Sequence, residues 1–292
     1  MTAAAEAVAG ERAVTPRSRF LDIGGLLLTA LTMIGAAVWF FPIFWALSTS
    51  LKTDDEAVRP GLNLLPETPT LDRYLYVIEH SNIGVWYLNS TITSVAITVL
   101  VLLMSACCGY AISQLRFPGR TLLWWTILAS FMVPVQALIV NHFIIVAGVK
   151  LLNTHAGIIV PMLIAPVTVI VYKQFFDSIP RDFREAAVID GATEFQLLFR
   201  IFIPMNWGVT TALGIITFIG AWNSFLWPFL VAQNELMMTV TVGITAVQDA
   251  FGVYYARVMA GAVLAGLPVA VAYLLFQKKV TQAITLSAGI KG

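Results

Sequence analysis

Few side chains in this sequence have the types and spacing that catalysis or metal binding needs. The three histidines, His80, His142 and His155, lie far apart, and none has an Asp or Glu partner at the spacing of metal ligands. The pattern G-x-x-x-x-G-K-[ST], whose glycine-rich loop binds the phosphates of ATP, is also absent. We therefore expect a chain without catalytic residues, metal or bound cofactor, so any energy from ATP has to come from another polypeptide.

Polar side chains inside the long apolar stretches could instead contact a polar solute as it crosses the membrane. Polar groups in hydrocarbon cost free energy and usually face a cavity or a neighbouring helix. The candidates for a translocation path are Asn89, Gln136, Asn141, His142, Trp222 and Asn223. The polar ones could equally bond a neighbouring helix, which contributes about 0.6 kcal/mol on average. Trp222, like Trp227, could instead pack in the core or lie in an aromatic belt.

Residues 180–204 form a charged stretch between two apolar ones. Asp182 is a good N-cap with a carboxylate at the capping-box spacing three residues later, and Gly191 suits a left-handed helix stop. Thr193 and Gln196 repeat the capping-box spacing, so they should begin a second short helix. The spacing predicts a helix–Gly–helix elbow whose outer surface is polar.

The second helix of this elbow should carry an apolar face. Phe195, Leu198, Phe199 and Phe202 follow the i, i+3, i+4, i+7 pattern that places side chains on one side of a helix. Pro204, which is tolerated in the first turn of a helix, then opens the next apolar segment.

The first helix of the elbow has the residues of a docking surface. Ala186 and Ala187 lack the bulk to hold a partner away, and Arg181, Arg184 and Glu185 can form ionic contacts around them. On shape alone, an ordinary amphipathic loop at the membrane interface is an equally good interpretation.

The elements that position these residues are membrane spans. The chain has 292 residues, 59% hydrophobic and 11% charged, whereas soluble domains carry about 25% charged residues. Six apolar segments lack Asp, Glu, Lys and Arg over about 20 residues or more, which is the length a spanning helix needs. We expect spans near residues 22–50, 87–113, 121–146, 156–177, 204–231 and 257–277, with the fourth kinked near Pro161 and Pro166.

The orientation follows from the positive charges in the connections. If the N-terminus lies inside, twelve of the 17 Lys and Arg residues fall in inner segments and five in outer ones. Both termini and the elbow should therefore be cytoplasmic. Residues 71–78 could form a short interfacial helix in the first outer loop, and the small residues 105–109 permit close helix packing.

The elbow motif resembles that of a known family. Glu185-Ala186-Ala187, then Gly191, then Ile201-x-Ile203-Pro204 resembles the EAA motif of ABC importer permeases, with Ile203 where the family usually has Leu. Three more features resemble the MalG-type subunit of carbohydrate importers. They are Ser50-Leu51-Lys52, the pair Trp222-Asn223 with Trp227-Pro228, and the terminal Ala288-Gly289-Ile290-Lys291-Gly292. The resemblance covers almost all of the chain after residue 20.

This resemblance implies an all-α, type I ABC importer transmembrane domain at 21–292 after a cytoplasmic tail, 1–20. The elbow, 180–204, would then be the coupling helix that seats in a cytoplasmic ATPase, and a tail at 278–292 would reach between two ATPase subunits. The residues implied for the elbow are Arg181, Arg184, Glu185, Ala186, Ala187, Asp190 and Gly191. Those implied for the tail are Gly289 and Lys291.

The implied partners are a MalF-like second permease, two ATPase subunits that hold ATP and Mg, an extracytoplasmic solute-binding protein and membrane lipid, without nucleic acid. The implied solute is a sugar or sugar derivative that crosses the bacterial cytoplasmic membrane. Contact with the binding protein is expected at the outer loop 232–256, through Asp249, Phe251, Tyr254 and Tyr255. The two tyrosines could instead anchor the sixth span at the lipid headgroups.

A stand-alone secondary transporter or channel is the alternative function. Such a protein is expected to carry ionisable groups in the middle of its spans for ion coupling or selectivity. Here the long apolar runs hold no Asp, Glu, Lys or Arg, which leaves His142 as the titrating candidate. The elbow would also have no role in such a protein.

Overall fold

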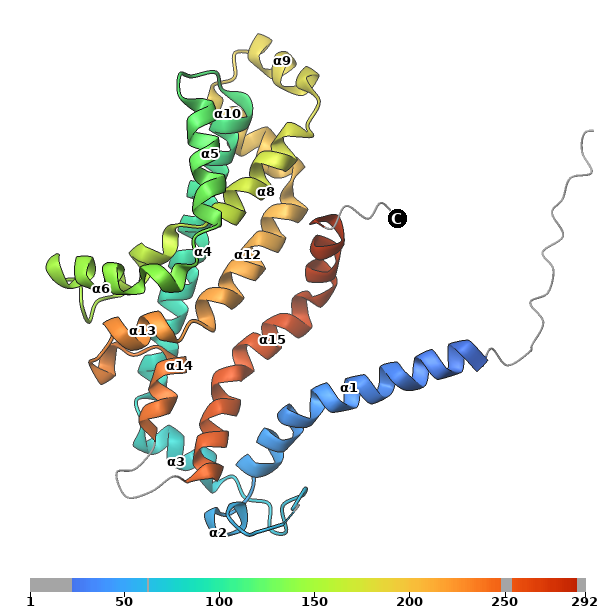
Figure 1. Cartoon of the computed structure of the whole chain (residues 1–292), viewed down its shortest axis with the longest axis vertical. Helices are drawn as coiled ribbons and strands as arrows, with labels where there is room; N and C mark the ends of the chain where they lie inside the picture. Colours follow the sequence, from blue (N-terminus) through green and yellow to red (C-terminus); the bar gives the residue numbers. More distant parts are fainter. Residues whose placement is uncertain (1–22, 62, 248–253, 288–292) are drawn as a thin grey trace, which may run out of the picture. The chain divides into compact units, whose positions relative to one another are not determined.

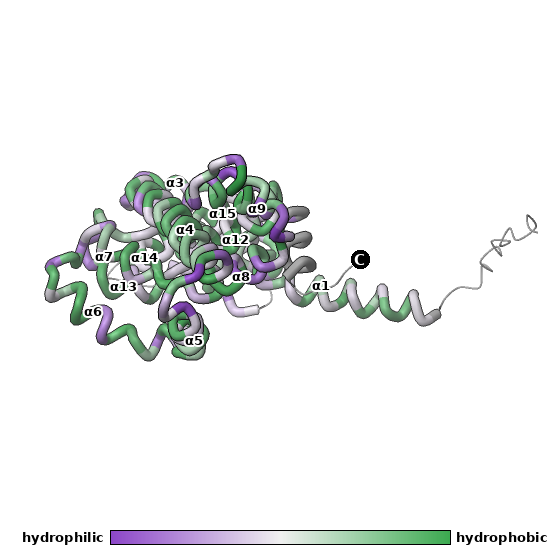
Figure 2. Tube along the Cα trace, turned by 90° about the horizontal axis from the view of Figure 1, so that it is seen from above, coloured by the Kyte–Doolittle hydropathy of each residue, from purple (hydrophilic) through white to green (hydrophobic). Residues whose placement is uncertain are grey.

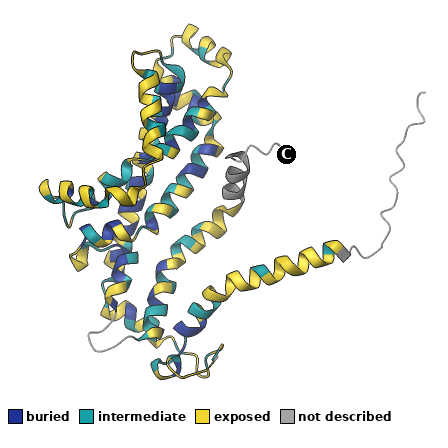
Figure 3. Ribbon diagram, viewed as in Figure 1, coloured by how far each residue is buried: buried dark blue, intermediate teal, exposed yellow. Residues whose placement is uncertain are grey.

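The computed structural model describes residues 23–61, 63–247 and 254–287, a part of the chain that contains helices and no strand (Figure 1). The chain falls into two compact units, Met1–Trp45 and Ala46–Gly292. The first unit holds most of α1 (Ile23–Ser50), whose large apolar side chains, such as Leu28 and Trp39, are exposed (Figure 3). An apolar helix surface of this kind is suited to lipid or to another membrane helix.

Three described helices are long and apolar enough to cross a membrane by themselves. They cover Gly24–Ser50 of α1, all of α4 (Ile83–Gln114) and Tyr255–Gln277 of α15 (Tyr255–Ser287). Three further pairs of helices pass the same test when each bent pair counts as one span, which brings the number to as many as six among the described residues. Figure 2 shows the largely hydrophobic character of the long helices.

The third predicted span is not one straight helix. It consists of α5 (Arg120–Phe131), the 3-10 turn η1 (Val135–Leu138) and α6 (Ile139–Gly148), with a bend of 94° between its halves. Pro134 lies at the break, where its ring and its missing N–H prevent a continuous helix. The span expected over 121–146 is therefore a bent pair of helices.

The predicted kink in the fourth span is confirmed. The helix α7 (His155–Ile159) with the 3-10 turn η2 (Val160–Leu163) meets α8 (Pro166–Asp177) at an angle of 48°. Each proline is tolerated because it stands in the first turn of its helix, where its missing N–H leaves no hydrogen bond unmade.

The fifth span is shorter than predicted at its far end. The helix α12 (Trp207–Trp222) stops well before residue 231, and α13 (Leu226–Val231) is a separate turn. Pro228 explains this break, because it cannot donate a hydrogen bond to the carbonyl of Ser224 four residues earlier. That carbonyl instead accepts a hydrogen bond of 2.8 Å from Thr241 Oγ1.

In the second unit, α4 packs against both α8 and α12 (Figure 1). The contact with α8 is close because Gly109 has no side chain, and a Cβ there would lie 2.9 Å from Tyr172 Cβ. Close packing at the small residues 105–109 is thus confirmed. A buried aromatic and aliphatic cluster at this end of the bundle joins α4, α8, α12 and the elbow.

Shorter elements close the other end of the bundle. They are α2 (Asp54–Ala57), α3 (Asp72–His80), η4 (Glu235–Met237), α14 (Val240–Gly243) and η5 (Ile244–Val247). The helix α3 confirms the short helix expected at 71–78. Ser50 and Lys52 hold the segment between α1 and α3 in place. Ser50 Oγ lies 2.6 Å from Tyr74 Oη, and Lys52 Nζ donates to the carbonyl of Asn63.

Candidate functional site

The first helix of the elbow, α9 (Arg181–Ile189), begins two residues earlier than the capping pattern predicts. Pro180 occupies the N-cap position with an extended backbone, φ −56° and ψ 138°, and no side chain caps the helix. Asp182 is therefore in the first turn rather than at the N-cap, and the expected capping box with Glu185 is wrong. The carboxylate of Asp182 still lies where the helix dipole favours a negative charge.

The end of α9 confirms the predicted glycine stop. Gly191 has φ +81°, in the left-handed region that glycine enters without steric cost. The N–H of Gly191 donates to the carbonyl of Val188 at 3.0 Å, and the N–H of Ala192 donates to that of Ala187 at 2.9 Å. These two bonds form a Schellman motif, which fixes the angle at which the chain leaves α9.

The second helix begins with the predicted capping box. The N–H of Thr193 donates to Gln196 Oε1 at 2.8 Å, and the N–H of Gln196 donates to Thr193 Oγ1 at 3.4 Å. The helix α10 (Glu194–Leu197) continues into a π-helical turn, η3 (Leu198–Phe202), and then into α11 (Ile203–Met205). The elbow thus rejoins the bundle at α12, after a bend of 84°.

The π turn changes which apolar side chains are buried. Leu198 and Phe202 are buried, whereas Phe195 and Phe199 are exposed. A π turn has a wider hydrogen-bond spacing than an α-helix, so the α-helical pattern does not hold across it. The four side chains predicted to share one face therefore divide between the core and the surface.

Arg184 and Glu194 join the two helices of the elbow. Arg184 Nη2 donates to Glu194 Oε1 at 2.6 Å, and the other carboxylate oxygen of Glu194 accepts a hydrogen bond from the hydroxyl of Tyr110 on α4. The guanidinium of Arg184 is thus engaged within the chain. Sequence reasoning missed Glu194 and Tyr110, because nothing in their local spacing indicates a contact between residues 84 positions apart.

The remaining predicted elbow residues divide between the surface and the bundle. Ala187 is half-buried and packs against the cluster beneath the elbow. The residues that are exposed are Arg181, Glu185, Ala186, Asp190 and Gly191. Large apolar side chains stand among them, with Ile189 85% and Phe195 73% exposed. The elbow therefore presents apolar and charged groups together.

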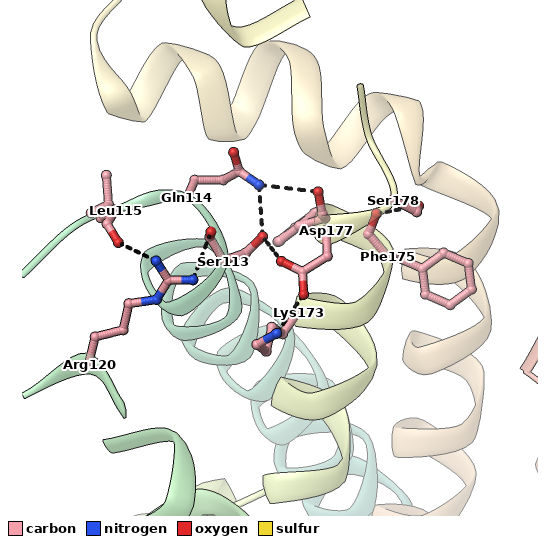
Figure 4. Close-up of polar contacts among 9 residues, drawn as sticks. Ser113, Gln114, Leu115, Arg120, Lys173, Phe175, Asp177 and Ser178 are labelled. Carbon is pink, nitrogen blue, oxygen red and sulfur yellow. Dashed lines mark hydrogen bonds and ion pairs between the residues drawn. The ribbon is translucent and has the colours of Figure 1, made fainter. Parts of the chain in front are cut away.

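A polar network supports the base of the elbow (Figure 4). Asp177 at the end of α8 accepts hydrogen bonds from Ser113 Oγ at 2.6 Å and from Lys173 Nζ at 2.5 Å. Arg120 at the start of α5 donates to the carbonyls of Ser113 and Leu115 at the end of α4. These bonds join the ends of three helices at the point from which the elbow extends.

Asn89, a path candidate, is buried at the other end of α4. Its side chain is 4% exposed, and its amide nitrogen donates to the carbonyls of Leu236 and Met238 at 2.9 and 3.0 Å. Its amide oxygen lies 3.0 Å from Nε2 of His155 on α7. These contacts match the helix-bonding alternative that the sequence left open. Sequence reasoning did not pair His155 with it.

The two tryptophans have partners in the core. Trp222 is 3% exposed and donates to the carbonyl of Ala265, and Trp227 donates to the carbonyls of Gly157 and Ile158. The ring of His142 lies 6.1 Å from that of Trp227 in an edge-to-face contact. Both tryptophans therefore pack in the core of the described structure.

The other path candidates lie at the surface of the described structure. They are Gln136, Asn141 and Asn223, of which Asn223 also ends α12. The structure therefore does not bring the six candidates together into one site. Among the residues described, no group of three or more His, Cys, Asp or Glu is placed to hold a metal ion.

The candidate contact with a binding protein is described only in part. Tyr254 stacks on the guanidinium of Arg257, which also lies over the ring of Tyr76 on α3, at 4.0 Å in each case. Tyr255 is exposed at the start of α15. Asp249 and Phe251, like Gly289 and Lys291 of the predicted tail and the N-terminal stretch 1–20, lie outside the described residues.

Comparison with known proteins identifies the family. Residues 102–285, more than half of the chain, match the family of binding-protein-dependent transport system inner membrane components. The chain belongs to this family. It is accordingly a membrane-located, non-catalytic component of a transport system, in agreement with the sequence analysis.

Relatives of this inner membrane component cover nearly its whole length. It is 33% identical over 270 residues to the arabinooligosaccharides transport system permease protein AraQ of Bacillus subtilis (strain 168), covering 91% of this chain and 96% of that protein. It is 34% identical over 255 residues to the sulfoquinovosyl glycerol transport system permease protein SmoH of Agrobacterium fabrum, covering 86% and 89%.

A solved structure has the same fold. It is a bacterial ABC transporter involved in the import of the acidic polysaccharide alginate, and one of its chains superposes with a TM-score of 0.80. The match covers 90% of this chain and 99% of that chain, at 24% identity. The predicted resemblance to ABC importer permeases and the all-α, type I transmembrane fold are therefore confirmed.

Proposed function

We propose that this protein is the permease subunit of an ATP-driven importer that carries a sugar or sugar derivative across the bacterial cytoplasmic membrane. Its relatives support the solute class. Their names refer to arabinooligosaccharides, sulfoquinovosyl glycerol, diacetylchitobiose and sn-glycerol-3-phosphate.

The observation that carries the proposal is the surface of the elbow. Ile189 and Phe195 are strongly exposed although they lie in a charged segment, and Ile189 is outside every candidate membrane span. Exposed apolar residues surrounded by polar ones mark a site of contact with a protein or with the membrane, and the EAA-like motif of this segment favours a protein. Arg181, Glu185 and Asp190 add charges around this patch. A separate ATPase that binds ATP and Mg is the partner we assign to it, which places the elbow and both termini in the cytoplasm.

The other partners follow from the same assignment. A second permease would cover part of the exposed apolar surface of α5 and α6 (Figure 3), where Gln136 and Asn141 would face a shared path. At the opposite end of the second unit, an extracytoplasmic binding protein would contact the outer loop and Tyr255. The tail with Gly289 and Lys291 would reach the ATPase.

The test is reconstitution of the transporter with its ATPase, its second permease and its binding protein in vesicles. Radiolabelled arabinotriose, diacetylchitobiose and glycerol-3-phosphate are offered one at a time, with ATP enclosed on the elbow side. We expect ATP-dependent uptake of at least one carbohydrate, and loss of uptake in Glu185→Lys with the chain still in the membrane. Glu67→Lys, a charge reversal at an exposed outer residue, is the matched control. Uptake that needs an ion gradient and no ATP would overturn the proposal.

A further inference from the structure

Tyr110 lies between the two places where the elbow joins the bundle. Its ring makes edge-to-face contacts with Phe176 on α8, before the elbow, and with Phe202 in η3, after it. The centroid distances are 6.2 and 5.1 Å, and Tyr110 is 3% exposed. Tight aromatic packing of this kind resists small displacements of one element against another. A single side chain of α4 therefore contacts both flanks of the elbow.

The hydroxyl of Tyr110 extends this contact into the elbow itself. It donates to Glu194 on α10, and the second oxygen of the same carboxylate accepts the 2.6 Å bond from Arg184 on α9. Hydrogen bonds to an ionised group are stronger and shorter than those between neutral groups. Arg184 and Glu194 are both partly shielded from solvent, with side chains 29% and 45% exposed. Three elements are thus joined through one carboxylate.

We propose that Arg184, Glu194 and Tyr110 form a link that transmits displacement of α9 to α4. The inference rests on the proposed docking of an ATPase on α9. Because the bonds from Arg184 to Glu194 and from Tyr110 to Glu194 are direct, a shift of α9 has to move α10 and displace the end of α4. The helix α4 also carries Asn89, which bonds to α7 and to the loop around η4 at the far end of the bundle. One continuous helix therefore connects the elbow to the far end.

This role differs from direct contact between Arg184 and the ATPase. A direct contact would make Arg184 important and Tyr110 unimportant, whereas a link makes all three residues interdependent. Replacing two members of one link should cause no more damage than replacing one, because either change breaks it. The two roles therefore give opposite results for Tyr110→Phe, which keeps the ring and removes the hydroxyl.

The experiment uses the complete transporter in lipid nanodiscs with a spin label on each side of the link. One label is placed on Cys107, an exposed native residue of α4, after Cys108→Ser, and the other on the exposed position 182 after Asp182→Cys. The width of the distance distribution between the labels reports how firmly α9 is held to α4. The second readout is binding-protein-stimulated ATP hydrolysis at constant subunit stoichiometry.

We expect Tyr110→Phe and Glu194→Ala to broaden the distance distribution and to lower stimulated hydrolysis by about fivefold or more. Adding Arg184→Ala to Tyr110→Phe should lower it no further. Tyr74→Phe is the matched control, because it removes a tyrosine hydroxyl from a 2.6 Å hydrogen bond with Ser50 at the other end of the bundle. It should leave both readouts unchanged.

Two results would overturn the link. The first is a Tyr110→Phe transporter whose distance distribution and hydrolysis equal those of the unaltered protein. The second is a defect confined to Arg184→Ala, which would make Arg184 a direct contact of the ATPase. Failure of the proposed function is distinct from both. In that case the unaltered chain would not associate with an ATPase, whereas the distance distribution would still show whether the three side chains hold α9 to α4.

Discussion

Asn89 and His155 join the first part of α4 to the beginning of α7, with 3.0 Å between the amide oxygen and Nε2 of the ring. The amide nitrogen of Asn89 is also used, by the carbonyls of Leu236 and Met238. A buried asparagine whose two polar atoms both have partners holds a structure together, and its removal leaves those partners unsatisfied.

Asn89→Ala should therefore destabilise the protein by about 1–3 kcal/mol, because buried groups lose their hydrogen bonds. The measurement is thermal unfolding of the purified protein in detergent. Asn141→Ala, at an exposed position of α6, is the control, and it should change stability by no more than about 0.5 kcal/mol. If Asn89→Ala unfolded normally but abolished uptake, Asn89 would belong to the translocation path after all.

Gly191→Ala should weaken the elbow, because an alanine at φ +81° costs about 1–2 kcal/mol relative to glycine. We expect less ATPase to co-purify with the variant while the membrane part keeps its thermal stability. Gly220→Ala in α12 is the control, since a Cβ there meets nothing within 4 Å and glycine is unfavourable inside a helix. Equal recovery of ATPase with both variants would contradict the role of the Schellman motif.

Gly109→Ala tests the close contact between α4 and α8. Its Cβ would lie 2.9 Å from Tyr172 Cβ and 3.1 Å from the backbone nitrogen of Lys173, so the helices have to separate. Overpacking of this kind costs about 1–3 kcal/mol, which a fall in the unfolding temperature would show. Gly84→Ala, in the same helix but in open space, should not lower it. A normal unfolding temperature for Gly109→Ala would mean that the helices part without cost.

The proposed orientation is tested by the accessibility of single cysteines in a background without Cys107 and Cys108. Cysteine at exposed position 67 should react with an impermeant thiol reagent added to intact cells. Cysteine at exposed position 182 in the elbow should react only after the membrane is permeabilised. The reverse pattern would show that the distribution of Lys and Arg gave the wrong orientation.

Features that depend on a few consecutive residues could be predicted from the sequence. The capping box of Thr193 and Gln196 and the left-handed stop at Gly191 formed as predicted, because their bonds close within one or two turns. The long apolar runs predicted membrane-length helices for the same reason, since length and composition alone decide whether a helix suits a bilayer.

The exact path of a broken span was decided by neighbours distant in the sequence. A proline frees a carbonyl, and the helix ends there if another element supplies a donor. The carbonyl of Ser224 accepts a hydrogen bond from Thr241 Oγ1, and α12 ends at Trp222. Likewise, the break at Pro134 became a bend of 94°, which no local pattern specifies.

The side chains that connect the candidate site to the bundle were determined only by tertiary structure. Tyr110 and Glu194 are 84 positions apart, and Asn89 and His155 are 66 apart. A helical period shows which residues share a face, but it does not show which helix lies opposite that face. Close packing of α4 against α8 at Gly109 lies beside Tyr110, and a separate contact between α4 and α7 holds Asn89 next to His155.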